Sequence, residues 1–358
     1  MRAAGTRAEG VLLAPYTTLR LGGPAKAFAE ADTAHELVRL VAEADRAGEP
    51  VLVLGGGSNL VVADEGFDGL VVRVAATGVS VVADGDRMLV TAEAGEDWDA
   101  LVRRCVTEGW SGVECLSGIP GLVGSTPIQN VGAYGQDVSQ TIAGVRVYDR
   151  RRGEVLDLPA ADCGFSYRHS VFKEALDRYV VLAVTYALER TPKSGPIAYA
   201  ELAKTLGVRL GERVRLTDAR AAVLDLRRSK GMVLDPDDPD TCSAGSFFTN
   251  PVLSAREAAE LELRAPGFPR WDAGDGAVKV PAAWLIEHAG FPKGYQRGPV
   301  RISTKHTLAL THPGGVGRGY AEATTADLLA LAREVRDGVA AKFGVRLVNE
   351  PIMVGCAL

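Results

Sequence analysis

Apolar residues recur along the chain with two spacings, one typical of helices and the other of strands. In the stretch 33–48, the apolar side chains that share one face of a helix are Leu37, Leu40, Val41 and Ala44. Thr33 and Glu36 have the spacing of a capping box, in which each side chain accepts a hydrogen bond from the other residue's backbone N–H. Gly48 follows the last apolar position. The pattern predicts a helix that begins at Thr33 and ends before Gly48.

Two further helices are predicted over 96–108 and 324–342, each followed by a glycine, Gly109 and Gly344. Apolar runs of strand length occupy 51–54, 69–74, 88–92, 145–148, 179–188 and 345–352. Helices and strands mixed over 358 residues predict an α+β or α/β protein.

Two proline-broken segments interrupt these elements, at 190–196 and 235–240. The second is an acidic loop that we expect to lack regular structure. A first domain is therefore predicted to end near residue 190, and a second to extend from about residue 220 to about residue 322.

Composition narrows the possible partners. The chain has 40 Lys and Arg against 45 Asp and Glu, a net charge of −5, so it has no overall basic field for nucleic acid. Its apolar runs are too short for a membrane helix or a signal-peptide core. The five cysteines and five histidines lack the spacings of metal ligands, and we expect no protein-bound metal. Glycine is in excess, with 41 residues, which indicates many tight turns and close approaches of the backbone to a ligand.

A run of three glycines, Gly55-Gly-Gly-Ser-Asn59, directly follows the strand at 51–54. Consecutive backbone N–H groups in such a run can point at one anion, although a glycine-rich hairpin turn has the same composition. The GxGxxG pattern of a Rossmann fold is absent, and the residues that follow have no helical period.

The stretch 116–135 is rich in glycine, hydroxyl and amide residues and contains no charged side chain. Exposed loops rarely lack charge over such a length. We therefore expect this segment to line a large, partly apolar and partly phosphorylated ligand.

Three residues are candidates for chemistry. Arg168 lies among aromatic and small polar residues, where a guanidinium can bind a carboxylate or phosphate in bidentate fashion or form a structural ion pair. Ser246 lies in a stretch of small residues typical of a tight turn, without the GxSxG pattern of a hydrolase nucleophile. Glu350 lies in an apolar run before a proline. It is either an exposed strand residue or a catalytic acid.

Taken together and in order, these segments resemble one known family. The matching segments are Tyr16–Ala25, GGGSNL at 55–60, GIPGLVGSTPIQNVGAYG at 118–135, FSYRHSVFK at 165–173, SAGSFFTNP at 243–251 and the Asn349-Glu-Pro ending. The chain resembles the UDP-N-acetylenolpyruvoylglucosamine reductases (the MurB family) over nearly its whole length.

The resemblance implies an α+β protein with a two-lobed FAD-binding fold of the vanillyl-alcohol oxidase type and a C-terminal α+β substrate-binding domain. The expected domains are a FAD-binding domain over 1–190, with lobes at about 16–75 and 76–190, and a substrate-binding domain over 223–322. A linker and substrate loop over 191–222 joins them, and a helix and strand over 323–358 carry Glu350.

The resemblance also implies the chemistry. NADPH reduces non-covalently bound FAD, and the flavin passes a hydride to the enolpyruvyl group of the UDP sugar, giving UDP-N-acetylmuramate for peptidoglycan, and hence for cell-wall formation, cell shape and cell division. Arg168 is expected to bind the substrate carboxylate, Ser246 to donate a proton to the enolate that follows, and Glu350 to act in its protonated form.

Other positions follow from the same resemblance. FAD would contact Gly55, Gly56, Gly57, Ser58, Asn59, Gly118, Ile119, Pro120, Gly121, Gly124, Ser125, Gln129, Asn130, Gly132 and Tyr134. The substrate would contact Tyr199, Lys230, Asn250 and His306, the last of which stands where the family often has glutamine.

Two rival functions remain open at this stage. One is a flavin-dependent alcohol or sugar oxidase of the same fold, whose flavin is often attached to a histidine or cysteine; no histidine lies within 55–60 or 116–135. The other is a catalytically idle flavin- or nucleotide-binding regulator. We expect a cytoplasmic monomer that binds neither nucleic acid nor membranes.

Overall fold

The computed structural model describes residues 6–315 and 322–358 and divides the chain into two compact units. Unit 1 comprises Met1–Val11, Ala25–Gly56 and Asp68–Ser229. Unit 2 comprises Leu12–Pro24, Gly57–Phe67 and Lys230–Leu358. Both units are therefore built from segments that are far apart in the sequence.

The first sheet of unit 1 has the order β1-β2-β5-β3. Its strands are β1 (Ala8–Leu12), β2 (Pro24–Ala31), β5 (Phe67–Val74) and β3 (Val51–Leu54). Helix α1 (Ala34–Arg46) packs its apolar face, including Leu37 and Val41, into the same core as Leu70 and Val72 of β5. This confirms the helix and the strand predicted for this region.

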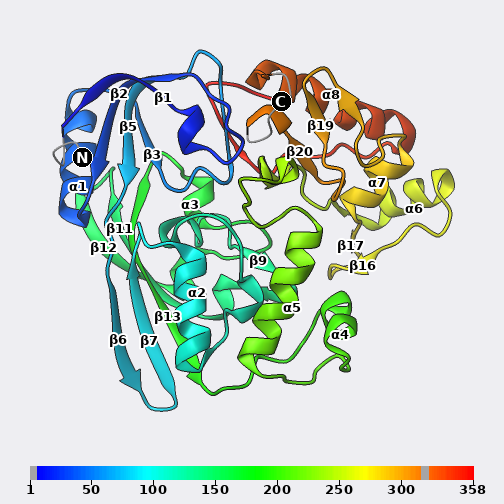
Figure 1. Ribbon diagram of the computed structural model, residues 1–358, viewed down its shortest axis with the longest axis horizontal. Helices are drawn as coiled ribbons and strands as arrows, with labels where there is room; N and C mark the ends of the chain where they lie inside the picture. The colour runs from blue at the N-terminus through cyan, green and yellow to red at the C-terminus, as the bar shows by residue number, and fades with distance from the viewer. Residues whose placement is uncertain (1–5, 316–321) are drawn as a thin grey trace. The chain divides into compact units, whose positions relative to one another are not determined.

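The second sheet of unit 1 is antiparallel, with the order β12-β11-β13-β7-β6 and the short strand β8 paired to β13. Its strands are β6 (Val79–Asp84), β7 (Arg87–Glu93), β8 (Trp110–Ser111), β11 (Ile142–Asp149), β12 (Glu154–Pro159) and β13 (Tyr179–Arg190). Helix α2 (Trp98–Glu108) lies beside β7 and β13 in Figure 1 and shares their core. Gly109 ends α2 in a left-handed conformation, as predicted.

Other helices and strands of unit 1 lie outside these two sheets. They are β9 (Gly132–Ala133), β10 (Gln136–Asp137), α3 (Val171–Glu174), α4 (Ala200–Leu206) and α5 (Leu216–Ser229). Helices α4 and α5 share a small core of their own, which includes Cys115, Leu202 and Val223.

The described residues of unit 2 form three small sheets. Their orders are β14-β20-β19-β18, β15-β17-β16 and the parallel pair β21-β4. The strands are β4 (Leu60–Val62), β14 (Ser243–Ser246), β15 (Val252–Leu253), β16 (Trp271–Asp272), β17 (Val278–Lys279), β18 (Gln296–Arg297), β19 (Val300–Ile302), β20 (Ala309–Thr311) and β21 (Ile352–Val354).

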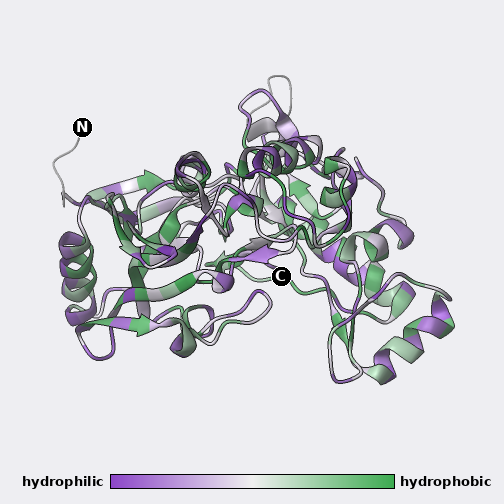
Figure 2. Cartoon of the chain, turned by 90° about the horizontal axis from the view of Figure 1, so that it is seen from below, coloured by the Kyte–Doolittle hydropathy of each residue, from purple (hydrophilic) through white to green (hydrophobic). Residues whose placement is uncertain are grey.

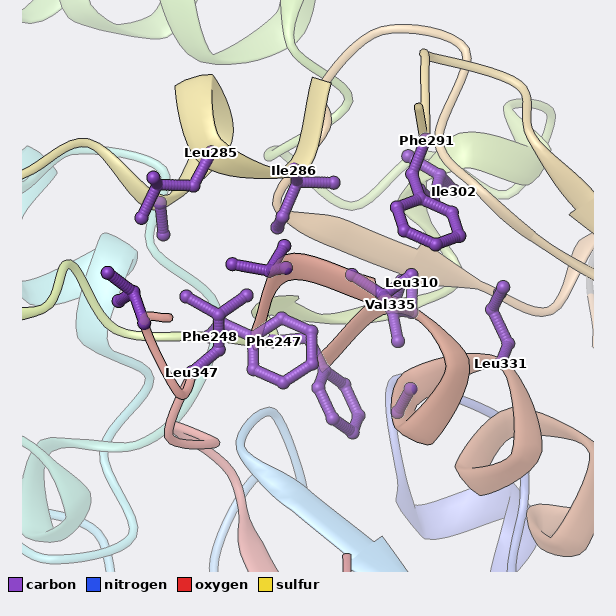
Figure 3. Packing of buried hydrophobic residues seen from close by; sticks show 14 of the residues in the cluster. Phe247, Phe248, Leu285, Ile286, Phe291, Ile302, Leu310, Leu331, Val335 and Leu347 are labelled. Carbon is purple, nitrogen blue, oxygen red and sulfur yellow. The ribbon is translucent and has the colours of Figure 1, made fainter. Parts of the chain in front are cut away.

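The α-helices in the part of unit 2 that the structure describes are α6 (Ala255–Arg264), α7 (Ala282–His288) and α8 (Thr325–Phe343). The side chains that α8 buries lie in one core with residues of α7 and of β19 and β20, and Figure 3 shows part of it. Helices throughout the chain carry hydrophilic residues beside hydrophobic ones, as expected where one side of a helix is buried (Figure 2).

Two local predictions were only partly correct. At α1, Thr33 accepts a hydrogen bond from Glu36 N (3.1 Å), but the Glu36 carboxylate accepts from Asp32 N instead of Thr33 N. The predicted strand over 345–352 is wrong for most of its length, because only Ile352–Val354 forms a strand, paired with β4. Val345 and Leu347 are nevertheless buried, in alternation with exposed Arg346 and Val348.

The compact units divide the chain differently from the expected domains, which remain predictions. Residues 191–229, expected as a linker and substrate loop, belong to unit 1, where Ser194 and Ile197 bond to Val214 and Glu212 through backbone groups. In residues 6–315 and 322–358, no helix is both long and apolar enough to cross a membrane.

Candidate active site

The first glycines of the 55–59 run lie against the glycine-rich segment 116–135 within unit 1. A Cβ atom added to Gly56 would come 2.8 Å from Gly121 Cα, and one added to Gly55 would come 2.7 Å from Ser125 Oγ. Both distances are shorter than real Cβ contacts. At Gly56 the obstacle is backbone, so glycine is required there for the two backbones to approach so closely, whereas at Gly55 it is a side-chain hydroxyl. The two segments predicted to bind one ligand are thus brought together.

Segment 116–135 is not an exposed loop, since every residue from Leu116 to Tyr134 is buried or half-buried. Trp98 N donates to Gly121 O (3.1 Å) and Val123 N to Glu96 O (2.9 Å), which fixes the segment to the start of α2. Other residues of this segment that are predicted to contact FAD are also buried or half-buried: Gly118, Ile119, Pro120, Gly124 and Gln129.

Asp99, in the first turn of α2, binds the backbone of this segment. Its Oδ1 accepts a hydrogen bond from Gly118 N (2.6 Å), and both its oxygens pair with the guanidinium of Arg220 on α5 (2.6 and 2.7 Å). Burial alone would raise the pKa of Asp99, but the hydrogen bonds from Arg220 and Gly118 outweigh burial and hold the pKa below its ordinary value.

Arg168 is held against the same segment. Its Nη2 donates to Gly132 O (2.7 Å) and its Nη1 to Asn130 O (3.4 Å), so two carbonyl oxygens orient the guanidinium. The backbone of Arg168 has a positive φ of 55°, a conformation that costs an L-residue about 1–3 kcal/mol and is common at functional sites. Lys173 Nζ donates to Arg168 O (3.1 Å) and supports this turn.

The Asn130 side chain serves this arrangement. Its Nδ2 donates to Ser166 O (3.1 Å), and its Oδ1 accepts from Ser139 N (3.1 Å). The side chain is therefore oriented by protein groups and ties the loop of Arg168 to the segment predicted to bind FAD.

Two tyrosines that we assigned to different ligands lie in contact. The rings of Tyr134 and Tyr199 meet edge to face, with centroids 5.4 Å apart, and Tyr199 immediately precedes α4. Burial raises the pKa of Tyr134 to about 12, so its hydroxyl stays protonated at neutral pH.

In unit 2, the end of the GGGSN run meets the C-terminal segment. Asn59 Nδ2 donates to Glu350 O (3.4 Å), and Ile352 N donates to Asn59 O (2.9 Å). Gly57 lies on the backbone of Tyr16, and Thr18 N donates to Gly57 O (3.1 Å).

Ser246 is the last residue of β14 and is half-buried. The pairing of β14 with β20 shifts register between Ser243 and Ser246, and Gly245 in this irregularity has a φ of 72°. Such a bulge redirects the side chain that follows it, and only glycine adopts this conformation readily.

The two phenylalanines after Ser246 anchor it. Phe247 and Phe248 are each 1% exposed, with ring centroids 5.2 Å apart. They lie in one cluster with Leu310, Val335 and Leu347 (Figure 3). The backbone of Ser246 is therefore fixed by the core of unit 2.

Glu350 is brought beside Ser246 by the backbone. Glu350 N donates to Phe247 O (2.9 Å), and Phe248 and Asn349 form an antiparallel bridge. The two residues predicted to act on the proton thus lie on adjacent, hydrogen-bonded segments of one unit.

The predicted substrate residues of unit 2 have separate local roles. Asn250 Oδ1 accepts from Ala282 N (2.9 Å) at the start of α7, which fixes the orientation of its amide. His306 N donates to Ser303 Oγ (3.2 Å) in a tight turn, and Lys230 is half-buried at the beginning of the last segment of unit 2.

Sequence reasoning missed three carboxylates that hold these segments: the buried Glu114 and Asp240 and the half-buried Asp99. Glu114 is fully buried and accepts from Gly112 N (2.7 Å), Gly195 N (2.7 Å) and Gln136 Nε2 (3.0 Å). In the sequence, each of them is only an acidic residue near a recognisable motif. Many acidic residues on a protein surface have the same kind of neighbours.

The residues present fit a flavin dinucleotide. Segment 116–135 has no charged side chain and offers backbone N–H, hydroxyl and amide groups, which suits a ring system and its phosphates. Among residues 6–315 and 322–358, no three His, Cys, Asp or Glu side chains are grouped so that they could hold a metal ion.

Comparison with known proteins identifies the family. Residues 25–159 match the FAD binding domain family, and residues 237–354 match the C-terminal domain of UDP-N-acetylenolpyruvoylglucosamine reductase. The reductase of that name from Thermobifida fusca is 60% identical, over 98% of this chain and 99% of its own. The one from Salinispora arenicola is 56% identical, over 97% of this chain and 95% of its own.

A solved structure agrees. The UDP-N-acetylenolpyruvylglucosamine reductase of Thermus caldophilus superposes with a TM-score of 0.65 at 26% identity, over 98% of each chain. The predicted fold class, a FAD-binding fold followed by a separate substrate-binding domain, is confirmed, and the relatives favour a reductase over an oxidase. The chain belongs to the UDP-N-acetylenolpyruvoylglucosamine reductase family, and it is a FAD-dependent oxidoreductase.

Proposed function

We propose that the protein reduces the enolpyruvyl group of UDP-N-acetylenolpyruvoylglucosamine to the lactyl ether of UDP-N-acetylmuramate, with NADPH as electron donor. The observation that carries this proposal is the 60% identity to a reductase of that name over nearly the whole of both chains. Such similarity extends over both family domains, so it covers the cofactor-binding and the substrate-binding parts.

FAD supplies the redox chemistry, since it accepts a hydride from NADPH and delivers a hydride to the substrate carbon. The chain would hold it with the closely packed backbones at Gly55–Gly56 and Gly121–Ser125. Backbone N–H groups there can bind phosphate without a basic field, in keeping with the net charge of −5.

Arg168 binds the substrate carboxylate in this proposal. Its guanidinium is oriented by the carbonyl oxygens of Asn130 and Gly132, so its position is fixed before the substrate binds. A fixed cation stabilises the negative charge that builds on the enolate and carboxylate as the hydride arrives.

Ser246 donates a proton to C2 of the enolate, and Glu350 acts in its protonated form beside it. A serine hydroxyl is a poor acid, so this transfer requires a strongly basic enolate and a hydroxyl held at the reacting carbon. The bulge at Gly245 and the hydrogen bond from Glu350 N to Phe247 O support such a fixed arrangement.

The substrate nucleotide would contact Tyr199, Lys230, Asn250 and His306. Lys230 contributes positive charge suited to a diphosphate, and Asn250 and His306 contribute polar groups. We place the reaction in the synthesis of peptidoglycan precursors and the protein in the cytoplasm, as a monomer.

The first experiment mixes purified protein with NADPH, with and without UDP-N-acetylenolpyruvoylglucosamine. NADPH oxidation followed at 340 nm should depend on the sugar nucleotide. Oxidation of NADPH at the same rate without the sugar nucleotide would contradict the proposal.

A second experiment tests Ser246. In Ser246→Ala, NADPH should reduce the flavin at the wild-type rate, whereas substrate should reoxidise it about 100- to 10,000-fold more slowly. Ser80→Ala, on the exposed strand β6, is the matched control and should leave both half-reactions unchanged. Equal losses in both half-reactions of Ser246→Ala would exclude the role as proton donor.

A further inference from the structure

The acidic loop 235–240, expected as an irregular boundary, is folded back into unit 2. Asp238 Oδ1 accepts from Asp240 N (3.1 Å), and Thr241 Oγ1 donates to the carbonyl oxygens of Asp235 and Asp238 (both 2.8 Å). Pro239–Thr241 form a short 3-10 helix, and Asp240 is only 3% exposed. The loop is thus a compact element that buries a carboxylate.

The Asp240 carboxylate binds one end of the turn that contains His306. Its Oδ1 accepts from Thr304 N (3.1 Å) and from Arg301 Nη2 (3.2 Å), and its Oδ2 accepts from Thr304 Oγ1. Lys305 Nζ pairs with Asp238 Oδ2 (2.6 Å). The acidic loop therefore binds two consecutive residues that immediately precede His306.

The turn itself leads to the partner strand of Ser246. The fully buried Ser303 accepts hydrogen bonds from the backbone of Lys305 and His306 (3.0 and 3.2 Å). Ala309 N then donates to His306 O (3.1 Å), and Ala309 lies opposite Ser246 in the pairing of β20 with β14. A shift of this turn would move both His306 and the strand that aligns Ser246.

Asp240 also lies on the segment that begins with Lys230. A Cβ atom added to Gly231, the neighbour of Lys230, would come 3.2 Å from Asp240 Cβ and 3.3 Å from Asp240 O. One buried residue is therefore in contact with the segments that carry Lys230 and His306, and only two residues separate it from β14.

We infer that Asp240 is a positioning residue for the substrate-binding part of the site: it holds the segments of Lys230, Ser246 and His306 in one arrangement without touching the reacting atoms. This inference rests on the proposed function. The buried Asp240 carboxylate accepts hydrogen bonds from Thr304 and from Arg301 at once, which is what holds the turn in place. Misplacement of groups by about 1 Å is enough to lower reaction rates about 100-fold.

The test compares Asp240→Ala and Asp240→Asn with the wild-type enzyme. Asp240→Ala should lower kcat/KM for UDP-N-acetylenolpyruvoylglucosamine about 10- to 100-fold, through a raised KM and slower reoxidation of the flavin by the sugar nucleotide, while NADPH reduces the flavin within twofold of the wild-type rate. Asp240→Asn keeps an oxygen acceptor for Thr304 N and should recover part of the loss. Asp237→Asn changes an exposed residue of the same loop and is the matched control, with unchanged KM.

Thr304→Val gives a second, milder test that keeps the buried carboxylate. Thr304 is exposed, and this change removes only its hydroxyl, which donates to Asp240 Oδ2. It should raise KM for the sugar nucleotide severalfold without changing the rate of flavin reduction by NADPH. Unchanged KM in all the Asp240 and Thr304 variants, or equal loss of both half-reactions, would overturn the inference. A wild-type enzyme that does not oxidise NADPH in response to the sugar nucleotide would instead refute the proposed function.

Discussion

Replacement of Gly57 by alanine tests whether this glycine is required by the protein itself rather than by a ligand. Gly57 has a φ of 60°, and an added Cβ would come 2.0 Å from Tyr16 O and 2.8 Å from Thr17 Cα, both in unit 2. Both obstacles are backbone atoms, so no side-chain rotation can relieve the overlap.

Two costs add in this variant. The left-handed conformation costs a residue with a Cβ about 1–2 kcal/mol. The overlap with the 16–17 backbone requires a main-chain shift of the kind that costs overpacked variants about 1–3 kcal/mol. We therefore expect Gly57→Ala to lower the free energy of unfolding by about 2–5 kcal/mol, even without any ligand.

Gly298→Ala is the matched control for Gly57→Ala. Gly298 lies in unit 2 with a φ of 56°, but an added Cβ there would meet no atom within 4 Å. This variant carries the conformational cost alone and should lose only about 1–2 kcal/mol. Urea unfolding of the flavin-free proteins, followed by circular dichroism, measures both. Equal losses in the two variants would show that the contact with Tyr16 relaxes freely and would refute the argument.

Two further predictions concern unit 2. Asp64 accepts hydrogen bonds from two backbone N–H groups in the first turn of α8 (2.7 and 2.9 Å), so Asp64→Ala should lower the urea midpoint by the equivalent of about 1 kcal/mol, whereas exposed Asp237→Ala should not. The buried His312 bonds through its two ring nitrogens to Leu19 O and Ala323 N, and burial lowers its pKa from the ordinary value of 6.5. The unfolded chain then binds the proton more tightly, so stability should be constant above about pH 6.5 and fall below it, down to the folded-state pKa. His312→Gln should flatten this fall between pH 7.5 and 5.5, and an undiminished fall in the variant would show that other groups cause it.

Helices α1, α2 and α8 could be predicted because their signals are local. Their apolar faces, N-terminal caps and the glycines that follow them lie within one stretch of chain each. The strand expected over 345–352 failed for the opposite reason. Buried and exposed residues do alternate there, but a strand also needs a neighbouring strand to which its backbone can hydrogen-bond. The side chains of Val345 and Leu347 instead pack into the hydrophobic core of unit 2.

The glycine-rich and SAGSFF segments could be recognised because their composition departs from that of ordinary loops. The carboxylates that hold them could not, because each acts on partners far away in sequence. Asp99 pairs with a residue 121 positions away, Glu114 bonds to one 81 positions away and Asp240 to one 64 positions away. Nothing in the residues around them distinguishes these acids from those on the surface.

The interleaving of the two units has a consequence for biosynthesis. β4, from near the N-terminus, pairs with β21 at the C-terminus, and Asn59 meets a residue 291 positions later. At roughly 5–20 residues per second, the ribosome releases the partner about 15–60 s after β4. The segments 12–24 and 57–67 bond to each other, for example through Gly23 N and Ala63 O (2.8 Å), but the rest of unit 2, Lys230–Leu358, is made much later. Unit 2 can be completed only after β21 has been made, so the nascent chain carries the apolar strand β4 without its partner strand while the residues between them are synthesised.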